Sequence, residues 1–336
     1  MQLKEYQQTA LTTIRNYFDH LTIWRKKAID NPDLEIDFPS KAWEKASIPR
    51  RYTSRKNGLG QPLPVFCLKV PTGGGKTLLA VKTIDLVNMV YRKQKGGLVL
   101  WIVPTTQIYR QTIQNLKDRD HPYRQHLDLA SGGRTTIVEK TDRFTPQDVR
   151  ENLVVLMLML PSANRKTKET LKVFKDSGGF QDFFPSEDDI KAQEALLKAF
   201  PNLDTYEKES GFWGRQIKTS LGNTLKLLSP VIILDEGHKA YSEGAQETLR
   251  GFNPSLVAEL SATPVQGNVI VDISGRDLHR EEMIKLDLHV VNKASPDWKD
   301  TLLAGANRRN VLEERGPRDC RNDAHGGEKR QMGFLS

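Results

Sequence analysis

The sequence predicts an α/β fold with a central, mostly parallel sheet flanked by helices. Four short apolar runs, at residues 65–70, 98–103, 154–160 and 231–234, are separated by long polar or helix-like segments. The run at 98–103 is apolar at every position, which is typical of a parallel strand buried on both faces. Several runs lead directly into glycines, acids or hydroxyl-bearing residues. We therefore expect polar chemistry at the carboxyl edge of the sheet.

The composition is that of an ordinary folded protein. Of the 336 residues, 38% are apolar, so the chain can bury one large core or two smaller ones. Fifty Lys and Arg against 42 Asp and Glu give a net charge of +8, which favours a polyanionic partner; a solvated basic face is the alternative. Two cysteines are too few for a disulfide framework or a four-thiolate zinc site. With no apolar run of about 18 residues and no secretory leader pattern, we expect a cytoplasmic protein without a membrane span.

The first 30 residues predict an amphipathic N-terminal helix. Apolar side chains recur at three- and four-residue steps from residue 3 to residue 21. Residues 31–64 hold five prolines and many charges, so we expect an irregular connection with one short helix near Ala42.

The run at 65–70 leads into a glycine-rich turn that predicts a phosphate-binding loop. Three consecutive glycines allow backbone N–H groups to converge on phosphate oxygens. Lys76 would reach the β- and γ-phosphates, Thr77 would place its hydroxyl on Mg²⁺, and a helix at 78–91 would direct its positive end at the anion. The first glycine of the usual G-x-x-x-x-G-K-[ST] pattern is Val70 here. The alternative is a structural turn with a surface lysine.

These features define the expected nucleotide-binding residues of the loop. They are Thr72, Gly73, Gly74, Gly75, Lys76 and Thr77.

A pair of acids follows the run at 231–234. Asp235 would hold Mg²⁺ through water, and Glu236 would polarise the water that attacks the phosphate. Taken alone, two acids at a strand end are a common surface feature. Together with the glycine-rich loop, they predict ATP and Mg²⁺ as ligands, with Thr77 and Asp235 on the metal.

These motifs resemble those of superfamily 2 DEAD/DEAH-box helicases and translocases. Residues 72–77 are similar to the family's T-G-x-G-K-T loop, and residues 235–238 are similar to its motif II. Ser261, Ala262 and Thr263 resemble motif III, which links the ATP state to DNA engagement. The resemblance implies a RecA-like domain whose catalytic residues are Lys76, Asp235, Glu236 and His238, with His238 coupling the nucleotide site to motif III.

Other segments resemble more narrowly the motor (Res) subunit of type III restriction endonucleases, over about residues 1–305. The similar segments are residues 3–8, 153–164, 218–223 and 234–241. This resemblance implies double-stranded DNA as a partner and a separate DNA methyltransferase subunit that reads the DNA sequence.

Two further roles are implied by the same resemblance. Gln7 would read adenine, for which a side-chain amide is suited because it both donates and accepts hydrogen bonds; the alternative is an exposed helix residue. Pro104, Thr105 and Gln111 would contact the nucleic-acid backbone, whereas the alternative for Thr105 is ordinary capping of a helix.

The domain organisation expected from these motifs is a RecA-like domain at 65–268 with a polar insert at 162–229. Residues 269–304 would begin an incomplete second lobe, and residues 305–336 would form a disordered basic tail.

The arginine motif of a second RecA-like lobe is not recognisable in the sequence. Two alternatives stay open at this point: another chain supplies that lobe, or the lobe was lost. In either case, we expect this chain alone to hydrolyse ATP slowly. The alternative functions are a nucleotide-dependent DNA-binding or assembly module without productive hydrolysis and, less favoured, a P-loop kinase.

Overall fold

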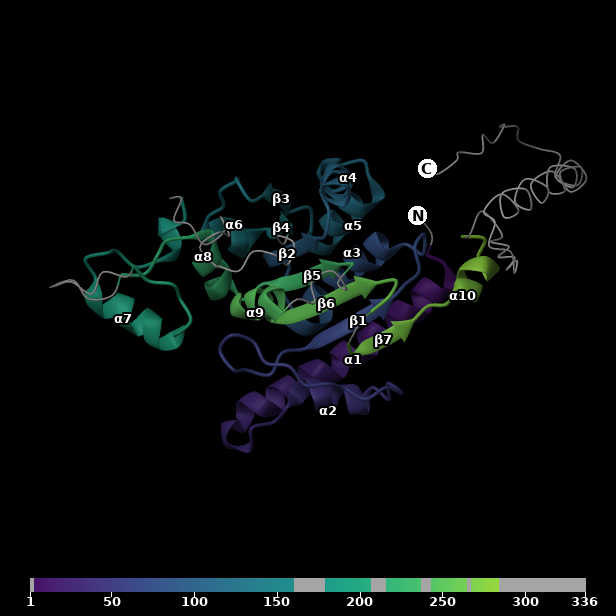
Figure 1. Ribbon diagram of the computed structural model, residues 1–336, viewed down its shortest axis with the longest axis horizontal. Helices are drawn as coiled ribbons and strands as arrows, with labels where there is room; N and C mark the ends of the chain where they lie inside the picture. Colours follow the sequence, from purple (N-terminus) through teal and green to yellow (C-terminus); the bar gives the residue numbers. More distant parts are fainter. Residues whose placement is uncertain (1–2, 160–178, 207–215, 237–242, 265–266, 284–336) are drawn as a thin grey trace, which may run out of the picture. The chain divides into compact units, whose positions relative to one another are not determined.

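The structure, a computed structural model, describes residues 3–159, 179–206, 216–236, 243–264 and 267–283. These residues contain a seven-stranded sheet in the order β3-β4-β2-β5-β6-β1-β7 (Figure 1). Every strand pair in it is parallel, so the expected α/β fold with a parallel sheet flanked by helices is confirmed. The strands are β1 Val65–Lys69, β2 Gly97–Val103, β3 Thr135–Glu139, β4 Leu153–Met159, β5 Val231–Asp235, β6 Leu256–Ser261 and β7 Val269–Asp272.

Helices connect the strands. They are α1 Glu5–Asp30, α2 Phe38–Lys45, α3 Lys76–Leu86, α4 Thr106–Lys117, α5 Pro122–Ser131, α6 Pro146–Glu151, α7 Ile190–Ala199, α8 Leu221–Leu228, α9 Glu243–Gly251 and α10 Gly275–Arg280. The expected short helix near Ala42 is α2, and α3 continues directly into a π-helix at Val87–Arg92. In the part of the chain that is described, no helix combines the length and apolar character needed to cross a membrane.

Both faces of the sheet are buried, which explains the unbroken apolar runs. Along β2, Val99 and Trp101 point into a core shared with α1, α3 and α5, whereas Leu98 and Leu100 point into a second core under α8 and α9. All four side chains have no exposed surface.

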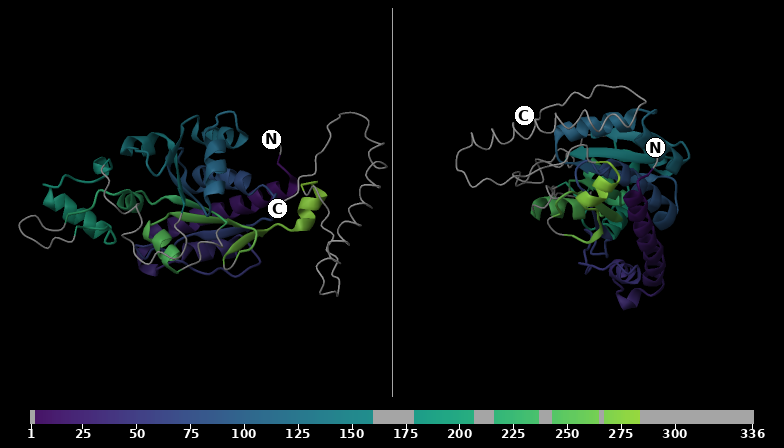
Figure 2. Two further views of the ribbon diagram at one scale, coloured as in Figure 1. Left: turned by 45° about the horizontal axis from the view of Figure 1, so that its top comes forward. Right: turned by 90° about the vertical axis from the view of Figure 1, so that its right-hand side faces the viewer.

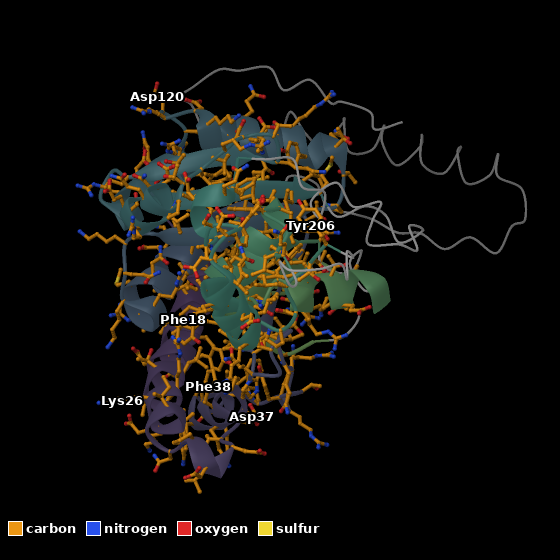
Figure 3. All side chains as sticks on the ribbon, turned by 90° about the vertical axis from the view of Figure 1, so that its left-hand side faces the viewer. Phe18, Lys26, Asp37, Phe38, Asp120 and Tyr206 are labelled. Carbon is orange, nitrogen blue, oxygen red and sulfur yellow. The ribbon has the colours of Figure 1, made fainter. Side chains whose placement is uncertain are left out.

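Helix α1 follows the edge of the sheet formed by β1 and β7, and α10 lies beside its N-terminal end (Figures 1 and 2). Phe18 points inward from α1, while Lys26 lies on the outer side (Figure 3). The Phe18 ring meets the Phe66 ring of β1 edge-on, with centroids 5.7 Å apart. This aromatic contact fixes α1 against the strand that precedes the glycine-rich loop.

Two regions differ from the sequence-based expectation. The strand at Val269–Asp272, expected to lead towards a second lobe, pairs with β1 in the central sheet. The expected polar insert contributes Phe180 and Leu225 to the second core, because both side chains pack under the sheet. The rest of the expected second lobe, at 284–304, and the tail at 305–336 lie outside the described residues.

Candidate active site

The strand order brings the three main motifs together. Strands β5, β6 and β1 are neighbours in the sheet and run parallel, so their carboxyl ends meet at one edge. The acid pair follows β5, the Ser261 motif follows β6, and the glycine-rich loop follows β1. The sheet topology thereby brings the glycine-rich loop next to two motifs that lie more than 150 residues later in the sequence.

The glycine-rich loop has the backbone geometry that the sequence predicts. Gly73 and Gly75 have φ angles of 83° and 81°, in the left-handed region that side chains disfavour. Gly75 is the N-cap of α3, so Lys76 and Thr77 stand at the positive end of that helix. This arrangement suits an anion at the loop.

Lys76 and Glu236 form a close ion pair across the edge of the sheet. The Lys76 Nζ lies 2.7 Å from Glu236 Oε1, and the two side chains are 13% and 18% exposed. The alternative of a surface lysine is therefore wrong, since Lys76 is largely buried against an acid of the neighbouring motif.

Asp235 is the more deeply buried acid of the pair. Burial raises the pKa of Asp235 to about 6; the charge of Glu236 acts in the same direction and that of Lys76 opposes it. Among the described residues, its Oδ1 is a buried oxygen with no hydrogen-bonding partner. A buried, unsatisfied carboxylate oxygen is costly unless a ligand completes it. The site therefore fits a hard cation such as Mg²⁺, which prefers oxygen ligands.

Gln7 and Tyr6 bring the start of α1 onto the loop. The Tyr6 hydroxyl donates to the carbonyl of Gly74 at 3.1 Å, and Gln7 Nε2 lies 3.4 Å from the same oxygen. Gln7 is 2% exposed, so the alternative of an exposed helix residue is wrong. Its contact with adenine stays a prediction.

The Ser261 motif is joined to the loop through the main chain. The N–H of Val70, at the end of β1, donates to the carbonyl of Ser261 at 2.9 Å. Ser261 has no exposed surface, and its Oγ accepts from the N–H of Thr263 at 3.2 Å. Ala262 and Thr263 follow on the accessible side of this turn. His238, expected to couple this motif to the nucleotide, lies outside the described residues.

The expected DNA-contacting residues lie at the end of β2, which is the neighbour of β5. Thr105 is the N-cap of α4, and its side chain accepts from the N–H of Ile108, which confirms the capping alternative for this residue. Pro104 is half-buried and Gln111 is exposed on α4. Their contact with nucleic acid stays a prediction.

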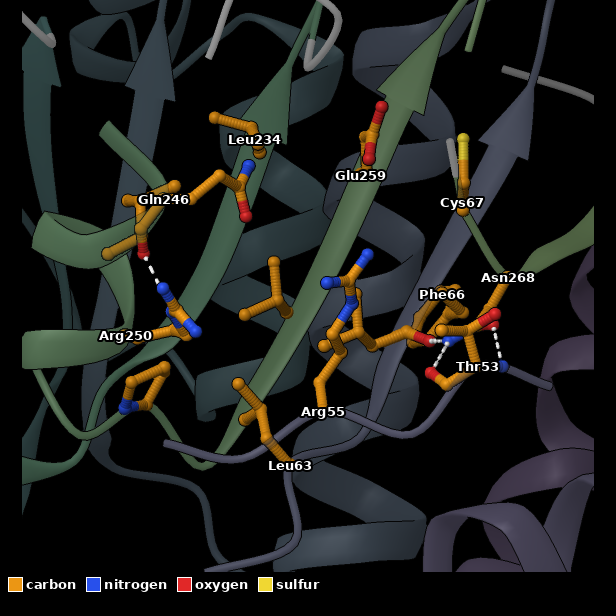
Figure 4. Close-up of a pocket in the computed structure, with 15 residues that line it drawn as sticks. Thr53, Arg55, Leu63, Phe66, Cys67, Leu234, Gln246, Arg250, Glu259 and Asn268 are labelled. Carbon is orange, nitrogen blue, oxygen red and sulfur yellow. Dashed lines mark hydrogen bonds between the residues drawn. The ribbon is translucent and has the colours of Figure 1, made fainter. Parts of the chain in front are cut away.

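A separate pocket of about 180 Å³ is lined by residues of strands β1 and β6 and of helix α9, which packs against the sheet. Figure 4 shows Glu259 and Cys67 at one end of this pocket and Leu63 at the other. None of the described residues expected in the nucleotide site lines it.

In the described part of the chain, no group of three or more His, Cys, Asp or Glu residues could hold a metal.

Sequence reasoning did not identify two residues that organise the site. Tyr6 lies in the segment already singled out around Gln7, so its position beside the loop had a local signal. Glu281 contacts the start of α1 from the other end of the domain. No pattern in the sequence indicated that contact, because it depends on how β7 and α10 close the sheet.

Comparisons with known proteins identify relatives of this fold. The family model described as type III restriction enzyme, res subunit, matches residues 1–266. Among curated proteins, none shows significant similarity to the sequence.

Two solved structures show distant similarity. One is a nuclease-deletion mutant of the type ISP restriction-modification enzyme LlaGI in complex with a DNA substrate mimic, with 12% identity and a TM-score of 0.36 over 84% of this chain and 21% of that one. The other is the helicase domain of Pyrococcus furiosus Hef, with 19% identity and a TM-score of 0.27 over 70% of this chain and 36% of that one. The chain thus spans well under half the length of either protein.

Proposed function

This chain belongs to the family of type III restriction enzyme res subunits and carries a helicase-like motor domain, and we propose that this domain binds and hydrolyses ATP to drive translocation on DNA. The observation that carries the proposal is the Lys76–Glu236 contact at the end of the phosphate loop, beside the buried Oδ1 of Asp235. A triphosphate bound in the loop would replace Glu236 as the partner of the Lys76 ammonium group. The carboxylate of Glu236 could then accept a hydrogen bond from the attacking water.

Each side chain then has a separate task. Lys76 binds the β- and γ-phosphates, and Glu236 orients the attacking water and accepts its proton. Thr77 and Asp235 would hold Mg²⁺, which neutralises charge on the phosphates when it is bound. Gln7, held on the carbonyl of Gly74, would hydrogen-bond to adenine.

Duplex DNA is the proposed substrate of the motor, and a methyltransferase subunit that reads DNA sequence is the proposed partner. Family membership supports both, and the net charge of +8 supports the DNA substrate alone. An arginine from a second RecA-like lobe would complete the hydrolytic site. The motif at Ser261, Ala262 and Thr263 would couple the nucleotide site to the residues that contact DNA.

The test is a titration of Mg²⁺ and ATP against the wild type and Lys76→Ala. We expect Lys76→Ala to lose ATP affinity by at least about tenfold, since a charge-assisted contact to phosphate is worth roughly 1.5–3 kcal/mol. Lys82→Ala, further along α3, is the matched control and should bind like the wild type. Equal ATP affinity for Lys76→Ala and wild type would contradict the assignment. ATP binding without DNA-stimulated turnover, measured with the partner subunit present, would favour the assembly-module alternative.

A further inference from the structure

The first turn of α1 depends on a residue from the far end of the domain. The N-cap of α1 is Lys4, whose side chain has no hydrogen-bond acceptor with which to satisfy the first N–H groups. Glu281 takes that role instead. Its Oε1 accepts from the N–H of Glu5 at 3.1 Å, across 276 residues of sequence.

A second set of contacts makes the connection reciprocal. Lys4 Nζ donates to the main-chain carbonyl of Glu281 at 2.8 Å and lies 3.7 Å from its Oε2. The side chains of Lys4 and Glu281 are 39% and 24% exposed, so the ion pair itself contributes little. The main-chain contact and the N–H contact together fix the position of the turn.

Glu281 is itself anchored beside the phosphate loop. It follows α10, whose Leu278 is 1% exposed and belongs to the same core as α1 and α3. A β-carbon placed on Gly74 would lie 3.5 Å from Leu278 Cδ1, so the side chain of Leu278 lies close to the loop. The carboxylate of Glu281 therefore reaches α1 from a segment that the buried Leu278 anchors in the core.

The turn that Glu281 holds is the one that presents Gln7. Gln7 Oε1 accepts from the N–H of Lys4 at 3.1 Å, while its Nε2 faces the carbonyl of Gly74. Burial raises the pKa of the adjacent Tyr6; the hydrogen bond with Gln7 opposes the shift and the charge of Glu281 adds to it. Glu281 is thus close enough for its charge to act on Tyr6, and it contacts the main chain two residues before Gln7.

We propose that Glu281 is a positioning residue for nucleotide specificity: by capping the first turn of α1, it holds Gln7 where it reads adenine. This inference rests on the proposed ATP site. Without the cap, the first turn loosens and the amide of Gln7 loses its fixed direction. Because Glu281 contacts Lys4 and Glu5, the proposed phosphate contacts of Lys76 and the glycine-rich loop should be retained. The loss is therefore specific for the base.

The experiment compares the Kd for ATP and for GTP, with Mg²⁺, in the full chain. We expect Glu281→Ala to raise the Kd for ATP about fivefold, as for one lost hydrogen bond, and the Kd for GTP by less than about twofold. Glu281→Gln keeps an acceptor for the N–H of Glu5 and should retain the wild-type ratio of the two constants. The matched control is Glu282→Ala, because Glu282 is the exposed neighbour and should also leave the ratio unchanged.

A double-mutant cycle separates positioning from general destabilisation. In the Gln7→Ala background, Glu281→Ala should change the ATP-to-GTP ratio by less than about twofold, since the group being positioned is gone. Lys4→Ala, which leaves α10 intact, should reproduce part of the effect of Glu281→Ala. Amide hydrogen exchange at residues 5–8 should be faster in Glu281→Ala than in Glu282→Ala without nucleotide.

Three results would overturn the inference. They are equal losses for ATP and GTP in Glu281→Ala, an undiminished effect of this substitution in the Gln7→Ala background, and unchanged exchange at residues 5–8. Each can occur while the wild type binds ATP and Lys76→Ala does not, which leaves the proposed function standing. Failure of the wild type to bind ATP would instead overturn the proposed function and this inference with it.

Discussion

Replacing Glu236 by Gln should strengthen ATP binding while it slows turnover. In the proposed ATP complex, the phosphates would compete with Glu236 for the ammonium group of Lys76, which lies 2.7 Å from the Glu236 carboxylate. Gln keeps the shape of the side chain and the left-handed backbone conformation at this position, where φ is 51°. The substitution therefore removes the negative charge beside Lys76, and with it the effect of that charge on the pKa of Asp235.

The size of the effect follows from the geometry of the pair. At 2.7 Å, two unit charges attract by about 6 kcal/mol at an effective dielectric constant of roughly 20. Desolvation of two side chains that are 13% and 18% exposed offsets most of that attraction. A net value of about 1 kcal/mol, at the upper end for exposed pairs, corresponds to an ATP Kd about fivefold lower in Glu236→Gln. Loss of the group that orients water should reduce the hydrolysis rate at least about a hundredfold.

The assay is an ATP titration with Mg²⁺ followed by single-turnover hydrolysis in the presence of duplex DNA. Glu247→Gln makes the same chemical change at an exposed position of α9 and should alter neither quantity. Weaker ATP binding by Glu236→Gln than by the wild type would refute the competition between carboxylate and phosphate. Undiminished hydrolysis would remove Glu236 from the role assigned to it.

Two other predictions concern DNA and the core. Binding to duplex DNA should be independent of the DNA sequence, because the expected contacts are to phosphates. The logarithm of the association constant should fall linearly with the logarithm of the salt concentration. A footprint confined to one short site would contradict this. Phe18→Ala should lower the free energy of unfolding by about 3–5 kcal/mol in a denaturant titration, since Phe18 has no exposed surface. Ile29→Ala, at a position of α1 that is 67% exposed, should change it by less than about 0.5 kcal/mol. Equal losses for the two substitutions would show that the Phe18 contact does not anchor α1.

The apolar runs predicted the central strands well because those strands are buried on both faces. Burial on two sides leaves no room for a polar residue, so β2 reads as an unbroken apolar segment. Strand β3 was not predicted. It lies at the edge of the sheet, where Thr136 and Ile137 are only half-buried, and its alternation is too weak to distinguish from a loop.

The insert was harder to predict for a different reason. Its contribution to the core comes from apolar residues that lie far apart in the chain, such as Phe180 and, in α8, Leu225, and no single helical or strand period extends over the whole insert. Sequence periodicity indicates local secondary structure, whereas the burial of these side chains depends on packing against strands that are distant in the sequence. The same limit applies to Glu281 and Lys4, whose contact is set by topology.

The departure of the phosphate loop from the common pattern also has a structural reason. Val70 occupies the position of the usual first glycine and has no exposed surface. A β-carbon on Gly74 would lie only 2.7 Å from Val70 Cγ1, and one on Gly75 would lie 2.6 Å from Gln7 Nε2. The absence of side chains at Gly74 and Gly75 therefore makes room for Val70 beneath the loop and for Gln7 above it. A valine can therefore stand at the first position of this pattern because Gly74 leaves free the space that the valine side chain fills, and Gln7 can approach the loop because Gly75 has no side chain.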